Sequence, residues 1–273
     1  MAANPTIGKW PEKSPPASTR RPTEEPRPAQ HETNRGPFGP YTTVLASLFI
    51  GVVYFGAQAG ALLGFASAVS RRAPPSTLSE ALAVVLSDGS MWAAALLLSA
   101  TTGIFVIATL VYLRRDGPSL REYLALRRVS FGIYIQWIAA FVILTTSING
   151  MLHFLGHQVV SDVMLETYTN ASKPALLWVA FIVAAPLFEE VFFRGFLYAS
   201  LVRTRLGVTG TIIVTSLVWA RMHTQQEPWG LIVIIVLGLA LGMARAQSAS
   251  LLPPLLLHIL NNTLAMLQTV ARS

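Results

Sequence analysis

Long apolar runs separated by short polar segments are the dominant pattern along this chain. Five runs carry no charged residue over a length close to or above the roughly 20 residues that a membrane-spanning helix needs. Two further apolar runs are interrupted by charged residues. The pattern predicts about seven membrane-spanning helices, from uncharged runs at 36–70, 89–113, 129–161, 228–244 and 246–271 and from interrupted runs at about 174–200 and 206–224.

The composition supports a membrane protein. Hydrophobic residues make up 53% of the chain and charged residues 12%, whereas a soluble domain carries about 25% charged residues. The predicted fold is therefore an all-α, polytopic transmembrane helical bundle of about seven spans. The chain has no cysteine, which excludes disulfides, a cysteine-ligated metal and a cysteine nucleophile.

The net charge of +7 is explained by membrane topology rather than by nucleic-acid binding, because the basic residues occupy alternate loops. Cytoplasmic loops carry the excess of Lys and Arg, so the N-terminus is predicted to be cytoplasmic. The N-terminal segment and the loops on its side contain Lys9, Lys13, Arg20, Arg21, Arg27, Arg35, Arg114, Arg115, Arg121, Arg127, Arg128, Arg203, Arg205 and Arg245, whereas the opposite side holds Arg71, Arg72, Lys173 and Arg272.

Two segments outside the spans have a distinct character. Residues 1–38 are rich in proline and polar residues with almost no apolar clusters, which predicts a disordered cytoplasmic tail in front of a transmembrane domain at 39–273. Between the second and third spans, residues 116–128 place apolar side chains at helical spacing among basic ones. This spacing predicts a short amphipathic helix that lies at the cytoplasmic interface and anchors the span ends.

Two adjacent glutamates and an arginine lie inside the run at 174–200. A carboxylate in the middle of a bilayer costs about 3 kcal/mol, so such a cluster indicates a functional site. On a helix Glu190 and Arg194 lie one turn apart, where their charges can pair and also simply hold the bundle together. Glu189 points about 100° away and has to find its partner on another helix, as a general base would.

Two of the five histidines lie in later apolar runs, each one turn from another distinctive side chain. His223 follows Trp219, and His258 precedes Asn262. With the predicted topology, Glu189 and His258 lie at similar depths, about ten residues from the cytoplasmic ends of their spans. His223 and Asn262 lie about one turn farther from that side. A single polar pocket formed by three helices can therefore hold them all.

These residues form three motifs in chain order: Glu-Glu-x-x-x-Arg, aromatic-x-x-x-His and His-x-x-x-Asn. The set resembles the CAAX protease and bacteriocin-processing family, also called the Abi or type II CAAX prenyl endopeptidase family of intramembrane glutamic proteases. The Phe-Arg-Gly sequence at 193–195 is also typical of this family. The resemblance covers about residues 175–266.

The resemblance implies hydrolysis of a peptide bond within or at the edge of the membrane, without a cofactor, in a conical or kinked-helix cavity. The first glutamate would activate water, and the first histidine would orient or share its proton. The second histidine and the asparagine would donate hydrogen bonds to the oxyanion, and the ion pair would set the position of the base. The implied catalytic residues are Glu189, His223, His258 and Asn262, supported by Glu190 and Arg194.

Some features depart from the family pattern or modify it. Trp219 stands where the family usually has Phe, a change of bulk that is not expected to change the chemistry. A polar segment, 224–228, follows His223, so the fifth span is expected to end at this histidine or to leave a different opening there. Pro186 and the pair 253–254 are expected to kink helices near the site.

The expected partners are the lipid bilayer and a peptide or membrane-protein substrate, with no nucleic acid. The substrate is a CAAX-type prenylated protein if the source organism prenylates proteins. The single compact module favours a bacterial plasma membrane and the processing of a peptide or membrane protein.

Three other functions fit parts of the pattern. Zinc held by Glu189, His223 and His258 would make a metalloprotease, although the His-Glu-x-x-His signature is absent. A non-catalytic immunity or scaffold protein of the same fold is the second, but a scaffold need not carry the intact motifs. A proton-coupled transporter is the third, because buried ionisable groups also mark ion pathways, but the chain lacks an internal-repeat pattern.

Overall fold

The structure of the protein, a computed structural model, describes residues 38–72, 77–114, 117–158, 160–223 and 226–273. The chain divides into two units, Met1–Asn34 and Arg35–Ser273, and the described residues all belong to the second. The predicted disordered tail at 1–38 therefore lies outside the described residues, apart from Phe38. All regular elements of the described residues are helices, which confirms the all-α prediction.

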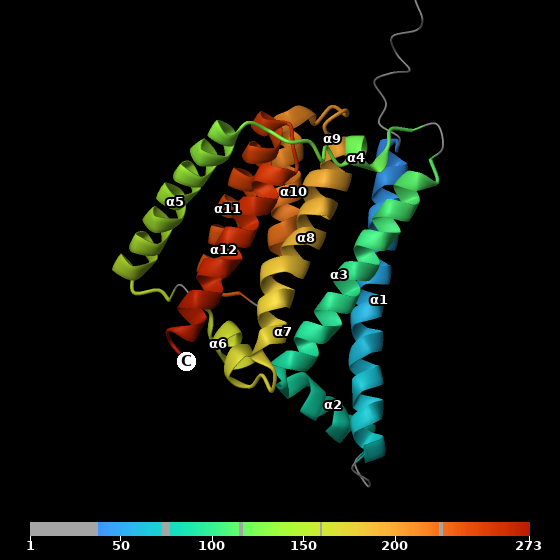
Figure 1. Ribbon diagram of the computed structural model, residues 1–273, viewed down its shortest axis with the longest axis vertical. Helices are drawn as coiled ribbons and strands as arrows, with labels where there is room; N and C mark the ends of the chain where they lie inside the picture. Colours follow the sequence, from blue (N-terminus) through green and yellow to red (C-terminus); the bar gives the residue numbers. More distant parts are fainter. Residues whose placement is uncertain (1–37, 73–76, 115–116, 159, 224–225) are drawn as a thin grey trace, which may run out of the picture. The chain divides into compact units, whose positions relative to one another are not determined.

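The apolar runs of the sequence fold into the main helices (Figure 1). Within the described residues, five helices are long and apolar enough to cross a membrane, so the chain is an integral membrane protein. These five are α1 (Pro40–Arg72), α3 (Gly89–Tyr112), α5 (Phe131–Phe154), the helix from α7 to α9 (Pro174–Leu201) and α11 (Pro228–Ser248).

The remaining two predicted spans are also helical. The run at 206–224 folds into α10 (Gly207–Arg221), which has 15 residues. The run at 246–271 folds into α12 (Leu252–Val270), which has 19 residues. Both pack against α11, but neither is among the five that are long and apolar enough to span, so the count of seven stays a prediction.

Short helices lie at the two ends of the long ones (Figure 1). The helix predicted at 116–128 is the single turn α4 (Leu120–Tyr123). It begins at a capping box between Ser119 and Glu122, and soon after it Ala125 takes up a left-handed φ of 52°, which a helix cannot continue. At the opposite end lie α2 (Leu78–Ser87) and α6 (Asp162–Thr169).

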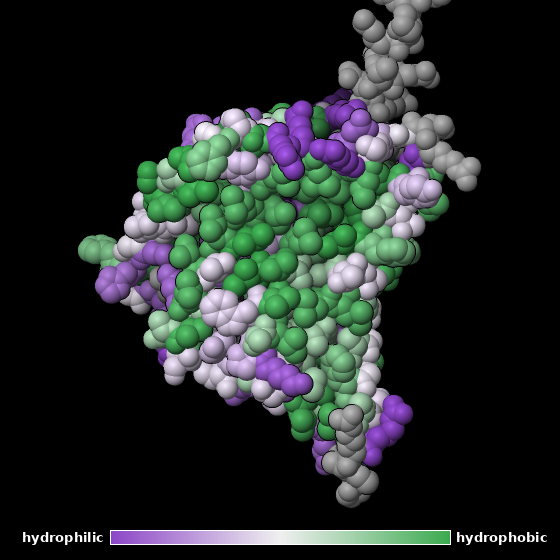
Figure 2. Space-filling view, viewed as in Figure 1, coloured by the Kyte–Doolittle hydropathy of each residue, from purple (hydrophilic) through white to green (hydrophobic). Residues whose placement is uncertain are grey.

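The outer surface of the helices is apolar. Figure 2 shows a broad hydrophobic face across the long helices, with hydrophilic residues gathered toward their ends. Large apolar side chains point outward from several helices, including Phe105 of α3 at 70% exposure and Ile143 of α5 at 68%. Such a surface is unsuited to water, and it fits helices that are surrounded by lipid.

The helix Pro174–Leu201, which we call the motif helix, packs closely against α1 and α3. The Phe188 ring is 2% exposed and stacks on Tyr54 of α1, with the ring centroids 4.2 Å apart. A Cβ at Gly103 of α3 would lie 2.4 Å from this phenylalanine ring. The missing side chain at residue 103 therefore allows α3 to lie directly against the motif helix.

Gly103→Ala is expected to lower the free energy of unfolding by about 1–3 kcal/mol, because a methyl group there overpacks the aromatic stack. The matched control is Gly150→Ala in α5, where nothing lies within 4 Å of the added Cβ. That control should raise the stability by about 0.5–1 kcal/mol through helix propensity alone. Denaturant unfolding in detergent micelles measures both, and equal effects of the two changes would contradict the packing argument.

The start of the motif helix is tied to the start of α3 by Asp88. This carboxylate caps α3 by accepting from the Ser90 N–H at 2.8 Å, and it also accepts from the N–H and hydroxyl of Ser172 at 3.1 and 2.8 Å. Partial burial acts to raise the pKa of Asp88, but the hydrogen bonds from Ser172 and Ser90 outweigh it and lower the pKa below its usual value.

This lowered pKa predicts a loss of stability in acid. The folded state favours the Asp88 carboxylate, so its contribution is complete above the unfolded pKa of about 3.9 and disappears as the pH falls through the lower folded pKa. Asp88→Asn should cost about 1 kcal/mol near neutral pH and should approach the wild type below about pH 4. Unfolding measured between acid and neutral pH tests this, and a difference that does not change with pH would contradict it.

Candidate active site

The two motif glutamates lie where the motif helix changes its winding. Glu189 and Glu190 close an α-helical stretch, and a wider π-helical segment begins at the next residue. Such π segments are rare in proteins and are frequent at functional sites. Along the motif helix the order is α7 (Pro174–Val179), a π segment at Ala180–Ala184, α8 (Ala185–Glu190), a π segment at Val191–Leu197 and α9 (Tyr198–Leu201).

The pairing predicted between Glu190 and Arg194 is confirmed. Oε1 of the glutamate lies 2.9 Å from Nη1 of the arginine, and the side chains are 0% and 1% exposed. The same Oε1 lies 2.9 Å from Nδ1 of His258 on α12. One carboxylate oxygen therefore joins the motif helix to the last helix, and the contacts of this ion pair hold the histidine rather than Glu189.

Arg194 is also held by α11. Its Nη2 donates to the carbonyl of Gly238 at 3.1 Å. Gly238 and Gly242 lie against α10, where an added Cβ would come within 2.9 Å of Ser216 and 2.7 Å of Ile212, respectively. The small-x-x-x-small spacing thus lets two helices pack closely behind the arginine.

Glu189 finds its partners on other helices, as the sequence predicts. Its Oε2 accepts a hydrogen bond from the indole Nε1–H of Trp219 on α10, and it lies 3.8 Å from Nε2 of His258. The Glu189 side chain is 15% exposed, whereas Glu190 is fully buried. The two adjacent carboxylates therefore have different surroundings, and only the first retains access to a ligand.

Trp219 adds a polar contact as well as bulk, and its effect on the chemistry stays a prediction. A phenylalanine side chain has no polar atom, whereas the indole N–H of tryptophan is a hydrogen-bond donor. In this structure the indole N–H donates to the Glu189 carboxylate. The ring also packs edge-on against His258 with centroids 5.3 Å apart, and the Arg194 guanidinium carbon lies 4.8 Å from its centroid. Its place one turn before His223 could have suggested an inward-facing donor.

His223 lies just beyond the end of α10, which stops at Arg221. Its Nδ1 is 2.9 Å from the carbonyl oxygen of Trp219, and its ring packs edge-on against the same tryptophan at 5.2 Å. The histidine thus contacts the residue that binds Glu189. Two residues of the polar segment after it, 224 and 225, lie outside the described residues.

Asn262 bonds to the motif helix from α12. Its Nδ2 donates to the carbonyl of Phe181 at 2.8 Å. In the π segment the N–H of Ala185 donates to the carbonyl of Ala180, five residues back. The next donor in this register would be residue 186 toward Phe181, but Pro186 has no N–H. The proline therefore frees the carbonyl that Asn262 occupies.

The other two prolines have a different effect from the one predicted. Pro253 and Pro254 lie in the first turn of α12, where a missing N–H removes no helical hydrogen bond. They begin this helix rather than kink it. The expected conical or kinked-helix cavity around Glu189 stays a prediction.

The donor atoms do not fit the zinc alternative. In the part of the chain that the structure describes, no three His, Asp or Glu side chains lie together as a metal ion would require. His258 and His223 both form their hydrogen bonds through Nδ1, which is compatible with a metal on Nε2. The misfit therefore lies in the spacing of Glu189, His223 and His258.

Apolar helices of spanning length, with ionised side chains paired in their interior, define an integral membrane protein with a polar site inside its helical bundle. Residues 171–264 match the family model of the type II CAAX prenyl endopeptidases, Rce1-like. The match covers 94 of the 273 residues, and the family that these residues resemble is a family of peptidases. The matched segment contains all three motifs. Searches of curated proteins and of solved structures gave no match.

Proposed function

We propose that this protein is an intramembrane endopeptidase in which Glu189 activates a water molecule. The observation that supports this most directly is the 3.8 Å separation between Glu189 Oε2 and His258 Nε2. It is too long for a direct hydrogen bond, but one water molecule can lie within about 2.7–3.2 Å of both atoms. The far nitrogen of the same imidazole ring is fixed by Glu190, so the near nitrogen has a defined direction.

Glu189 takes a proton from this water as the oxygen attacks the carbonyl carbon of the substrate, and the carbonyl oxygen becomes an oxyanion. Glu189 then returns the proton to the amide nitrogen as the C–N bond breaks. His258 turns Nδ1 toward Glu190 and presents Nε2 as the donor to the oxyanion.

The other motif residues support these two. Trp219 holds Glu189 by its indole N–H, and His223 in turn holds Trp219. The Asn262 side-chain amide donates one hydrogen to the Phe181 carbonyl. Its second amide hydrogen can donate to the oxyanion. We therefore treat Trp219 and His223 as positioning residues and Asn262 as a second oxyanion donor.

The basic end of the helices is proposed to face the cytoplasm. At the end of the molecule where α3, α9 and α11 finish, the described residues include several arginines and one acid, Glu122. At the opposite end, basic and acidic residues are mixed. The described charges at the first end are Arg114, Arg121, Glu122, Arg127, Arg128, Arg203, Arg205 and Arg245, and those at the second are Arg71, Glu80, Asp88, Asp162, Glu166, Lys173, Arg221, Glu227 and Arg272. With this orientation the N-terminus is proposed to be cytoplasmic, and a bacterial plasma membrane is the proposed location.

The substrate is proposed to be a membrane-associated peptide or protein, prenylated at a CAAX-type terminus where the source organism prenylates proteins. The test compares the protein termini in membranes of cells that carry the wild type with those of Glu189→Gln cells. Uncleaved termini that accumulate in the variant, and that the purified wild type cleaves in nanodiscs, would support the peptidase. If Glu189→Ala cells keep the cellular phenotype, the non-catalytic scaffold or immunity function holds instead.

A chelation experiment separates the two peptidase mechanisms. Full activity after exhaustive chelation, with no metal in the purified protein by elemental analysis, supports a glutamate-activated water. Activity that is lost on chelation and restored by zinc would overturn it in favour of a metalloprotease.

A further inference from the structure

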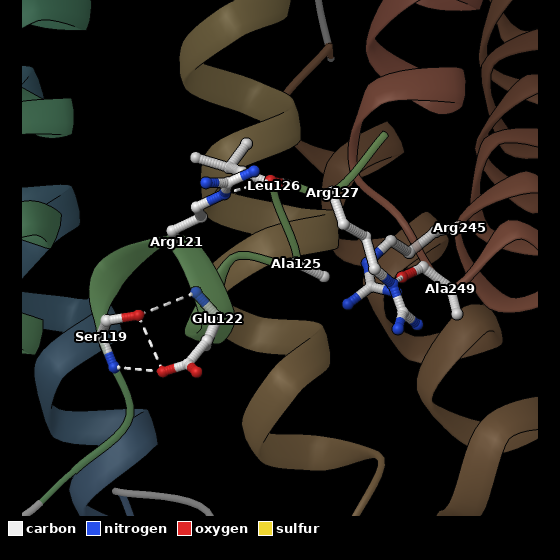
Figure 3. A pocket seen from close by; sticks show the side chains of 8 residues that line it. All are labelled: Ser119, Arg121, Glu122, Ala125, Leu126, Arg127, Arg245 and Ala249. Carbon is white, nitrogen blue, oxygen red and sulfur yellow. Dashed lines mark hydrogen bonds between the residues drawn. The ribbon is translucent and has the colours of Figure 1, made fainter. Parts of the chain in front are cut away.

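A cavity of about 560 Å³ lies where the loop after α4 meets the end of α11 (Figure 3). Arg127 enters it from the loop and Arg245 from the last turn of α11, and Arg121 also lines it. Because α11 spans the apolar part of the molecule up to Ser248, the cavity lies at the level where lipid head groups meet the protein.

The cavity brings two like charges together without a neutralising acid. The guanidinium groups of Arg127 and Arg245 lie beside one another, and their charges interact. Arg245 is only 7% exposed, and among the described residues neither arginine forms an ion pair with a carboxylate. The carboxylate in the lining, Glu122, is bonded to the N–H and hydroxyl of Ser119 at 2.9 and 2.7 Å. The arginines thus repel each other unless an anion lies between them.

The backbone around the cavity is strained and firmly cross-linked. Ala125 and Ala249 both line it, and both have left-handed φ angles, 52° and 49°. Such a conformation costs about 1–3 kcal/mol for a residue other than glycine, and it is typical of functional sites. The two segments are joined by bonds from Leu251 N–H to the Ala125 carbonyl, from the Ser250 hydroxyl to the Arg127 carbonyl and from Arg127 Nε to the Ala249 carbonyl.

We propose that this cavity binds a phosphate group and that its occupant is the head group of an anionic phospholipid. Guanidinium groups match phosphate oxygens with paired hydrogen bonds, and basic pockets between membrane helices are typical sites for lipid phosphates. The proposal does not depend on the peptidase mechanism. Arg245 also donates from Nε to the main-chain carbonyl of Arg194 at 3.0 Å, so a bound phosphate would steady the motif helix.

The test measures thermal unfolding of the full-length protein in phosphatidylcholine nanodiscs with increasing fractions of phosphatidylglycerol. Arg127→Gln removes one of the guanidinium groups that line the cavity. The matched control is Arg128→Gln, because Arg128 is an exposed arginine in the same loop that does not line the cavity. The wild type and the control should be stabilised alike. Arg127→Gln should need at least about fivefold more phosphatidylglycerol for half the effect.

Each other outcome decides against part of the proposal. Equal responses of the two variants would assign the effect to diffuse charge and would overturn the site. Stabilisation of the detergent-solubilised protein by millimolar inorganic phosphate, lost in Arg127→Gln, would keep the phosphate site but overturn its assignment to a lipid. If Arg127→Gln does not fold in pure phosphatidylcholine, Arg121→Gln takes its place with the same expected shift.

Discussion

Replacing Glu189 with glutamine is expected to lower kcat for peptide hydrolysis by about 10²–10⁴-fold, the range that general acid–base catalysis contributes. Glutamine keeps the size of the side chain and an oxygen that can accept from Trp219, but it cannot take a proton from water. The melting temperature should change little, because the Glu189 side chain is partly exposed and forms no close ion pair. Turnover of a cleaved peptide in nanodiscs, with the melting temperature measured on the same samples, checks both expectations.

Trp219→Phe is the matched control for this change, since it removes the indole donor and keeps an aromatic ring. The loss of one hydrogen bond to a charged group, about 1.5 kcal/mol, corresponds to about tenfold in kcat with KM nearly unchanged. A Glu189→Gln protein that keeps a tenth or more of the wild-type rate would show that another group activates the water. A Trp219→Phe loss as large as that of Glu189→Gln would instead assign the tryptophan a direct part in the chemistry.

Replacing Arg194 with methionine is expected to destabilise the protein by about 3–5 kcal/mol, the largest effect on stability that we expect from a single substitution. The change leaves Glu190 as a buried charge without its main partner. It also removes the hydrogen bond from Arg194 to the Gly238 carbonyl. Unfolding of the purified protein in detergent, followed by loss of helical structure, measures the effect.

Two variants test whether the buried charge is the cause. Arg203→Met removes an exposed arginine shortly after the end of the motif helix, and it should change the stability by less than about 0.5 kcal/mol. The double change Glu190→Gln with Arg194→Met removes both charges and should recover part of the loss. No recovery in the double variant would show that the arginine acts through packing rather than through the ion pair.

The sequence predicted the parts of this molecule that depend on spacing along a helix. The apolar runs marked the helices, and the separation of four residues between Glu190 and Arg194 was enough to predict their ion pair. The family motifs also indicated that Glu189 and His258, on different helices, belong to one site. Their separation of 3.8 Å agrees with this prediction.

The sequence could not predict contacts that depend on the exact winding and packing of the helices. The π segment before Pro186 decides that the Phe181 carbonyl is free, and no periodicity in the sequence reveals that segment. The bond from Trp219 to Glu189 depends on the rotation of α10 against the motif helix. The meeting of Arg127 with Arg245, separated by more than a hundred residues, is likewise a product of tertiary packing.

Two hydrogen bonds connect α11 to Arg194 of the motif helix. Gly238 accepts from the side chain of Arg194, and Arg245 donates to its main chain, so one helix holds one residue of the motif helix from both directions. A slide of α11 along the motif helix by one residue, about 1.5 Å, would break both bonds. Any movement of α11 along the motif helix therefore has to break these two bonds or carry Arg194, and with it the paired Glu190, along.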